Sequence, residues 1–393
     1  MKHTGKIYLL TLITFVVSTS EGVIAGILDK VAASVNVPLA VAGQLITIFA
    51  IANAFGSPLV MIAAAKWNQR KVLIVSLMIM VIGCAATFWL SGFGYLMLSR
   101  VVLAIGSGVF AIAAKTAASH LAPPEKQAGA IGTILLGFSA AIIVGVPIGR
   151  VVAMSHDWRF IFVGIGLLSL LSIMAIMAVI PAKIKGEVTP IGMQLAYLKQ
   201  PKILTGLAVT FFWQLGYGMM YAYITPFLLQ VALLREGQIS MALFAFGIAT
   251  LIGSKFGGWM SDVVGNGKTL MGSLTVHALA LVTLSVMPGS TFVTIPLLMV
   301  WSFSAWASGP GMQYNLIELA PQARGIMLGL YGSFIQLGIA AAGGIGGLAS
   351  NGGSMRLVGL VAAASVTIAL LLSRYSSRRS LKKIDRLMAS GRR

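Results

Sequence analysis

The sequence predicts an all-α membrane protein with twelve transmembrane helices, and its composition and apolar pattern are the basis for this prediction. Of the 393 residues, 58% are hydrophobic and 9% are charged. Soluble domains have about 45–50% apolar and about 25% charged residues, so no water-soluble fold of this length could hide so much apolar surface. Disorder is excluded as well, because disordered chains are polar and highly charged. Twelve apolar runs have about the 20 residues that a membrane-spanning helix needs.

The runs follow one another along the whole chain. They cover residues 7–28, 39–64, 72–92, 95–118, 128–153, 159–181, 203–231, 238–260, 269–288, 291–312, 323–349 and 355–373. Transmembrane strands have about ten residues that alternate in polarity, whereas these runs are longer and apolar on all sides, which predicts helices. The first run is too long for the apolar segment of a signal peptide, and no cleavage site follows it. We therefore expect a permanent first span.

Basic residues stand between the apolar runs and give the chain a net charge of +19. A nucleic-acid-binding protein clusters such residues on one soluble face, so membrane lipids are expected as partners and nucleic acid is not. The more basic loops belong in the cytoplasm, which places both termini there. A single cysteine, Cys84, excludes an intrachain disulfide.

The longest polar stretch lies in the middle of the chain and separates six spans from six. It predicts four segments, an N-terminal six-helix bundle over 1–182, a central cytoplasmic linker over 183–202, a C-terminal six-helix bundle over 203–373 and a basic cytoplasmic tail over 374–393. Two related bundles of this kind hold a substrate site between them in secondary transporters.

Glu21 is the one acid that lies well inside an apolar run. An ionisable residue at the centre of a span costs about 2.5–3.5 kcal/mol on insertion scales, so its presence indicates a function. Thr14, Ser18, Glu21 and Ala25 share one helical face, which should border a bundle interior or cavity. A carboxyl group removed from water holds a proton more readily. We expect Glu21 to carry a proton or bind a cation; the alternative is a structural carboxylate that pairs with a basic residue or caps the backbone.

Arg100 begins span four, on one face with Ala104, Ser107 and Ala111. Its permanent charge can donate to carbonyls or pair with an acid. Alternatively, the long side chain reaches the outer membrane interface.

Spans seven and ten carry stripes of polar and aromatic residues at helical spacing. The stripes are Thr210, Gln214, Tyr217 and Tyr221 in span seven, and Ser302, Trp306, Gly309 and Gln313 in span ten. Flat, partly polar ligands stack and hydrogen-bond on such faces. The expected binding residues for a small-molecule substrate are Gln214, Tyr217, Tyr221, Trp306 and Gln313, with Ser18 and Gln44. Hydrogen bonding between helices is the alternative explanation.

Motifs for nucleotide binding, metal binding and serine hydrolysis are absent from the sequence. We therefore expect neither an enzyme nor a bound cofactor or metal.

One loop resembles the signature loop of the major facilitator superfamily. It lies between spans eight and nine and contains Gly258, Asp262 and Gly265. The resemblance implies that Asp262 caps a helix start and latches a cytoplasmic gate, while the glycines permit the turn. The sister loop between spans two and three lacks the aspartate and keeps only the basic pair, Arg70 and Lys71.

Two further motifs resemble those of the same superfamily. Arg100 resembles the span-four arginine that is tied to proton transfer. Span five resembles the antiporter motif of the superfamily in Gly137, Gly145, Pro147 and Gly149. The proline bends the helix, and the glycines allow close packing at the bundle interface.

A more specific likeness is to bacterial twelve-span drug:proton antiporters, and among them to purine base and nucleoside efflux pumps. It is carried by Val41–Leu45, Tyr221–Leu228 and Ile317–Pro321. The resemblance implies the major facilitator fold in a monomeric efflux pump of the bacterial inner membrane, driven by the proton gradient. The alternatives are a sugar or metabolite efflux pump, or a facilitator or importer that exchanges no proton.

Overall fold

The computed structural model describes residues 3–64, 66–123, 127–181, 197–287, 290–351 and 354–390. Twelve helical segments within these ranges are long and apolar enough to cross a membrane, which confirms the predicted spans. Most of the predicted central linker, residues 182–196, lies outside the described residues, as do residues 391–393 of the predicted tail.

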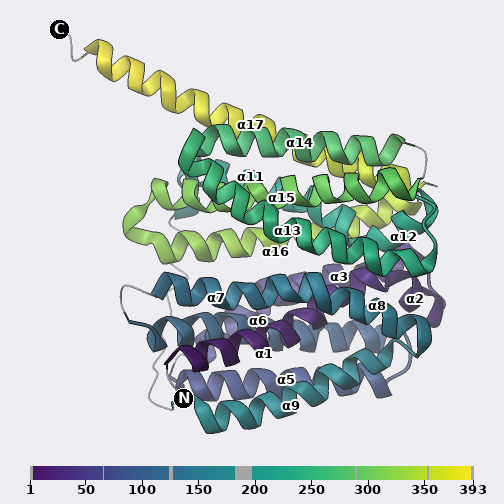
Figure 1. Ribbon diagram of the computed structural model, residues 1–393. Coiled ribbons are helices and arrows are strands. Elements are labelled where there is room, and N and C mark those ends of the chain that lie inside the picture. The colour runs from purple at the N-terminus through teal and green to yellow at the C-terminus, as the bar shows by residue number, and fades with distance from the viewer. Residues whose placement is uncertain are drawn as a thin grey trace.

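The first six spans form one half of the molecule and the last six form the other, stacked upon it (Figure 1). The N-terminal half contains α1 (His3–Gly26), α2 (Leu28–Ser34), α3 (Leu39–Ile51), η1 (Ala52–Gly56), α4 (Ser57–Ala63), α5 (Gln69–Trp89), α6 (Phe93–Leu121), α7 (Gln127–Ala140), η3 (Ala141–Gly145), α8 (Val146–Ser155) and α9 (Arg159–Val179). The C-terminal half contains α11 (Pro201–Ala222), α12 (Ile224–Gln230), α13 (Glu236–Val264), α14 (Asn266–Val286), α15 (Thr291–Leu319), η4 (Pro321–Ala323), α16 (Arg324–Asn351) and α17 (Met355–Ser390). Across the junction, α3 packs on α16, and η3 and α8 pack on α13.

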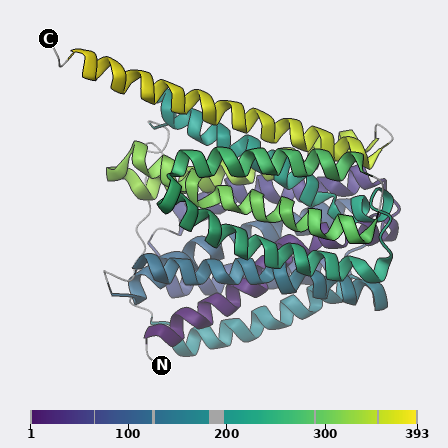
Figure 2. The same cartoon turned by 45° about the horizontal axis from the view of Figure 1, so that its top comes forward.

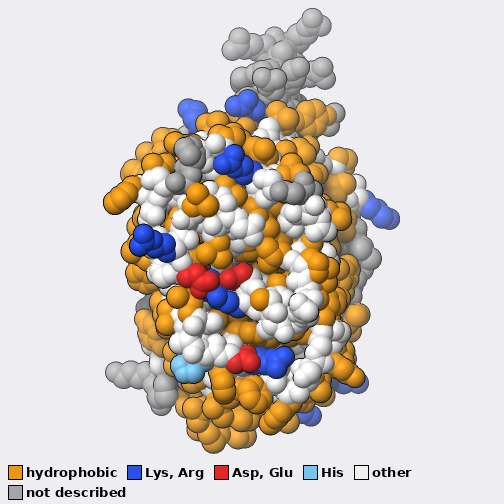
Figure 3. Space-filling view, turned by 90° about the vertical axis from the view of Figure 1, so that its right-hand side faces the viewer, with side chains coloured by type: hydrophobic (Ala, Val, Ile, Leu, Met, Phe, Trp, Pro, Cys, Tyr) orange, Lys and Arg blue, Asp and Glu red, His pale blue; other side chains and the backbone are white. Residues whose placement is uncertain are grey.

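Both termini lie at the same end of the helices (Figures 1 and 2), as an even number of spans requires. We call this the terminal end, and the opposite end, with α2 and α12, the distal end. Seen from the distal end, acidic side chains lie beside basic ones towards the middle of the face, and apolar side chains cover much of its flanks (Figure 3). This apolar girdle is the surface that a lipid bilayer would cover.

Spans one and seven are each interrupted near the distal end, which the continuous apolar runs did not predict. The backbone leaves helical geometry at Ile27 (φ −128°, ψ 18°) and at Tyr223 (φ −108°, ψ 18°). A break frees backbone carbonyls, which must be satisfied inside a membrane. The Thr225 hydroxyl donates to the carbonyls of Ala25 and Gly26 at 3.3 and 3.0 Å, so the two breaks are joined across the halves.

Spans two and five each contain a π-helical turn, η1 and η3. Pro58 and Pro147 follow these turns at the second positions of α4 and α8. A proline has no N–H to donate, and its ring crowds the carbonyl one turn earlier. A wider turn before it relieves that crowding, which accounts for the position of both π turns.

Candidate transport site

The Glu21 carboxylate lies inside the N-terminal half, five residues before the end of α1. The other acids of the described spans, Glu236, Asp262 and Glu318, lie within three residues of a span end. Glu21 takes part in none of the ion pairs found among the described residues. The alternative of a directly paired structural carboxylate is therefore not realised in this conformation. The charges of Arg100 and Lys115 on α6 are near enough to attract it.

Arg100 is buried beside Glu21 and does not reach a membrane interface, because its exposed fraction is 1%. Its Nη1 atom donates to the Ser20 carbonyl at 2.9 Å, and Nη2 approaches the Glu21 carbonyl at 3.5 Å. The guanidinium carbon lies 4.3 Å from the centre of the Phe49 ring. Arg100 thus binds the backbone of α1 and leaves the Glu21 carboxylate without a direct ion pair.

Five side chains of the C-terminal half form an aromatic cluster, which consists of Tyr217, Tyr221, Phe246, Trp301 and Trp306. The Tyr217 ring centre lies 5.8 Å from that of Tyr221, 5.6 Å from Trp301 and 6.0 Å from Trp306. The Phe246 ring completes the cluster, 5.1 Å from Trp301 and 5.6 Å from Tyr221. Its members come from α11, α13 and α15, so three helices build one aromatic wall.

The aromatic cluster meets the N-terminal half next to Glu21. A Cβ atom added to Gly22 would lie 3.5 Å from the Tyr221 hydroxyl oxygen. On the other side of the cluster, the Trp306 ring centre lies 6.4 Å from that of Phe138 in α7. The structure thus brings the predicted residues Glu21, Tyr221 and Trp306 into one region at the junction of the halves.

Other predicted substrate residues lie at the edges of this region. A Cβ atom on Gly338 would lie 2.8 Å from the Gln214 Cβ, so Gln214 packs against α16. Gln313 is partly buried and lies close to Tyr331, also on α16. Ser18 is buried and Gln44 is partly buried, on α1 and α3.

Ser302 of the span-ten stripe forms hydrogen bonds between helices, which was the alternative explanation of that stripe. Its hydroxyl donates to the Phe246 carbonyl at 2.8 Å and lies 2.7 Å from the Thr250 hydroxyl. It therefore ties α15 to α13.

The sequence patterns missed Phe246 and Trp301 as members of the cluster. Phe246 lies in an ordinary apolar run, and Trp301 is off the polar face of span ten. Each side chain is fully buried, and only the packing of α13 against α15 reveals their place.

The signature loop forms its turn at Gly265, where φ is +93°. The predicted capping role of Asp262 is wrong, because α13 continues to Val264 and the residue before α14, Gly265, supplies no side chain. Asn266 stabilises the turn instead, since its amide donates to the Gly311 carbonyl at 3.0 Å. Asp262 is exposed, and a Cβ atom on Gly258 would meet open space.

The basic pair of the sister loop has local contacts. Arg70 donates to the Met177 carbonyl of α9. The Lys71 ammonium lies 4.2 Å from the Trp67 ring centre. Both contacts lie within the N-terminal half, at its terminal end.

The glycines of the span-five motif pack against α1, within the N-terminal half. Cβ atoms on Gly137, Gly145 and Gly149 would clash with Thr11, Thr19 and Val23. Close packing is thus confirmed, but the expectation that these glycines meet the other half is wrong. Ile143 of the same span does contact the other half, because its Cα would lie 2.5 Å from a Cβ on Gly247 of α13. Pro147 is buried after the π turn.

Two helical halves with interrupted spans and a polar, aromatic region at their junction define the class of secondary transporters. A family model described as Major Facilitator Superfamily matches residues 10–235 and 207–388. The chain belongs to the Major Facilitator Superfamily.

Relatives in Bacillus subtilis (strain 168) are named as transporters of the same type. The MFS-type transporter YbcL is 38% identical over 373 residues, which are 95% of this chain and 96% of YbcL. The MFS-type transporter YtbD is 25% identical over 380 residues, which are 95% of this chain and 94% of YtbD.

Solved structures show the same fold at low sequence identity. A bacterial homologue of the human lysosomal transporter Spinster, in an inward-facing and unoccupied conformation, has a TM-score of 0.79 at 15% identity, covering 97% of this chain and 98% of that chain. The nucleoside transporter NupG has a TM-score of 0.75 at 13% identity, covering 94% and 99%. The fold is the major facilitator fold, and the chain is a membrane transporter of that superfamily.

Proposed function

We propose that the chain is a proton-coupled efflux antiporter of a bacterial cytoplasmic membrane. It exports small organic molecules, with purine bases, nucleosides and drug-like compounds as the first classes to test. One observation carries the proposal: Glu21 is an acid inside a span that takes part in none of the ion pairs among the described residues, and it lies beside an aromatic cluster of the other half.

Coupling follows from the place of Glu21 at the junction. A protonated Glu21 is neutral, so the halves can rock past each other without carrying a bare charge through a closed interior. Substrate binding on the cytoplasmic side displaces the proton, and the loaded site then opens outward. Arg100 holds the backbone of α1 in place beside Glu21. One charge crossing 100 mV is worth about 2.3 kcal/mol, which sustains a roughly fiftyfold gradient of a neutral substrate.

The aromatic cluster supports a planar substrate. Tyr217 and Tyr221 lie nearly parallel, with 7° between their rings, and Trp306 stands edge-on at 85° to Tyr217. Such surfaces favour flat rings with polar edges. Nucleosides belong in the panel because NupG, a protein of the same fold, is named as a nucleoside transporter.

The terminal end would face the cytoplasm, with the protein acting as a monomer of two six-helix halves, a central linker and a basic tail. Hydrogen bonds and an ion pair join the halves at the distal end. With this orientation, the conformation described is closed to the outside. Asp262 and the basic pair Arg70 and Lys71 would act at the cytoplasmic gate in the opposite state.

The test is proton release from purified protein in weakly buffered detergent as each compound is added. Wild type is compared with Glu21→Gln and with Glu318→Gln, which removes an acid near a span end. We expect release from wild type and Glu318→Gln, and none from Glu21→Gln. Equal release from all three proteins would move the proton site away from Glu21. Binding without release from wild type would favour a facilitator.

A further inference from the structure

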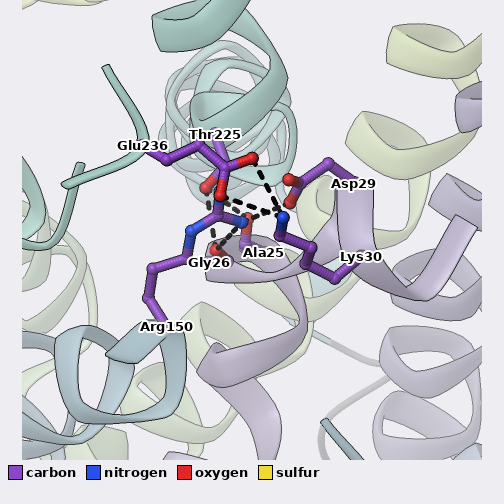
Figure 4. A network of polar contacts seen from close by, with 7 residues as sticks. All are labelled: Ala25, Gly26, Asp29, Lys30, Arg150, Thr225 and Glu236. Atoms are coloured by element: carbon purple, nitrogen blue, oxygen red, sulfur yellow. Dashed lines mark hydrogen bonds and ion pairs between the residues drawn. The ribbon is translucent and has the colours of Figure 1, made fainter. Parts of the chain in front are cut away.

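Four charged side chains from both halves meet at the distal end (Figure 4). Asp29 and Lys30 lie on α2 and Arg150 on α8, all in the N-terminal half. Glu236, at the first position of α13, is the one charge contributed by the C-terminal half. The group therefore has two acidic and two basic side chains, and their charges cancel only when the two halves are in contact at this end.

Glu236 lies between two cations of the opposite half. Its Oε1 and Oε2 atoms are each 2.9 Å from the Lys30 Nζ. Its Oε2 is also 3.9 Å from the Arg150 Nη2. Separation of the halves at this end would break both ion pairs.

Asp29 and Arg150 form a pair within the N-terminal half. Arg150 Nη1 lies 2.5 Å from Asp29 Oδ1 and 3.5 Å from the Gly26 carbonyl, where span one is interrupted. The Arg150 side chain is 0% exposed, and a buried guanidinium without a carboxylate is costly. Because α2 and α8 belong to the same half, Asp29 can keep Arg150 paired whether or not Glu236 is present.

Other hydrogen bonds also join the two halves. Thr225 donates to the Ala25 and Gly26 carbonyls. The Thr47 hydroxyl donates to the Ala340 carbonyl at 2.9 Å, joining α3 to α16. The charged group is thus part of the contact that closes the distal end.

We propose that Glu236 is the moving part of a charge latch that holds the distal end shut. Lys30 and Arg150 receive it, and Asp29 is the retaining acid that keeps Arg150 paired when the latch opens. The inference rests on the proposed function only in taking the two halves to open alternately. It does not depend on proton exchange at Glu21 or on the identity of the substrate.

The latch must be weak enough to open in every transport cycle, and the exposure of its outer pair meets this condition. The side chains of Lys30 and Glu236 are 32% and 47% exposed. Exposed ion pairs shift an equilibrium by only about 1.4- to 5-fold. Loss of Glu236 should therefore raise the ratio of open to closed protein several-fold, without unfolding the protein.

The test measures the distance between the halves at the distal end by pulsed electron spin resonance. Spin labels replace Ala33 on α2 and Gly237 on α13, which are both exposed. The background carries Cys84→Ser, since Cys84 is the only cysteine of the chain. The measured quantity is the ratio of long to short distances in the full-length protein.

We expect Glu236→Gln to raise this ratio about two- to fivefold. The matched control Glu318→Gln removes an acid near the terminal end of α15, and it should leave the ratio unchanged. The charge exchange Lys30→Glu with Glu236→Lys should restore only part of the short distance, because the new lysine pairs with position 30 but faces Arg150. High salt should act on wild type in the direction of Glu236→Gln, because exposed pairs are screened.

Asp29→Asn distinguishes the retaining acid from the moving one. It should lower the thermal unfolding temperature more than Glu236→Gln does, because it leaves the buried Arg150 without its nearest carboxylate. An unchanged distance ratio in Glu236→Gln would overturn the latch. Equal thermal losses in the two variants would overturn the role of Asp29. Loss of proton release in Glu21→Gln, or its absence in wild type, bears on the proposed function alone.

Discussion

Replacing Gly43 with alanine should weaken the contact of α3 with α16, where the two halves approach each other closely through Gly43 and Gly343. An added Cβ would overlap the Tyr223 hydroxyl and lie 2.7 Å from its Cζ and 3.3 Å from the Gly343 carbonyl oxygen. Tyr223 is fully buried, and its hydroxyl donates to that carbonyl at 2.9 Å. The ring must therefore move, and the hydrogen bond is lost.

Two costs add up for Gly43→Ala. Overpacking of a tight interior costs about 1–3 kcal/mol. A buried hydrogen-bonding group left without its partner costs about 1–3 kcal/mol. The total is about 2–6 kcal/mol. For a cooperative unit of about 150–250 residues, the size of one half, each kcal/mol lowers the unfolding temperature by about 2–4 °C.

The assay is thermal unfolding in detergent, with two companion variants. Gly344→Ala is the matched control, because a Cβ there has its nearest neighbour at 3.9 Å, the Thr47 hydroxyl. Tyr223→Phe removes the oxygen that the new methyl group overlaps, so the double variant should lose less than the sum of the single losses. The reasoning is refuted if Gly43→Ala and Gly344→Ala unfold at the same temperature. It is also refuted if the double variant loses the sum of what Gly43→Ala and Tyr223→Phe lose separately.

Three further substitutions test the site. Arg100→Gln removes the charged donor to the Ser20 carbonyl and should lower the transport rate at least tenfold, measured as uptake into everted vesicles, while binding persists. Trp213→Phe breaks the indole hydrogen bond to the Ala305 carbonyl, 3.1 Å long and buried, and should cost about 1–3 kcal/mol of stability in thermal unfolding. Trp301→Leu opens the aromatic cluster and should weaken binding of a planar substrate about tenfold by calorimetry, with a smaller effect on a non-aromatic one.

The spans and Glu21 could be predicted from the sequence because both depend on local contrast. A run of apolar residues has the length of a bilayer whatever it packs against. Glu21 is conspicuous because its neighbours in the span carry no other charge. These properties need no knowledge of the partner helices.

The helix breaks and the distal charges could not be predicted in this way. Ile27 and Tyr223 are residues that helices accept, and the interruption after Gly26 is stabilised by Thr225, about 200 positions away in the chain. Likewise, Asp29 and Glu236 stand at the ends of apolar runs, where charge is ordinary. Their shared contact with Arg150 exists only when three distant segments are folded together.

For the signature loop, the turn at Gly265 could be predicted from the sequence, whereas the capping role of Asp262 could not. The positive φ at Gly265 needs a residue without a side chain, which the sequence shows directly. Whether Asp262 caps α14 depends on where α13 ends, and helix ends are poorly defined by apolar patterns.

The two π turns lie at matching positions in spans two and five of the N-terminal half. Each ends in a glycine, Gly56 or Gly145, with a proline two positions later. A Cβ on Gly56 would lie 2.8 Å from Ile105 of span four, and one on Gly145 would clash with Thr19 of span one. If spans one to three are exchanged with spans four to six, span two takes the place of span five and span four that of span one. The contact of Gly56 then corresponds to that of Gly145, which is the pattern that nested repeats produce. The N-terminal half therefore has the pseudo-symmetry of two three-helix units, each with one glycine-x-proline bend in its middle span.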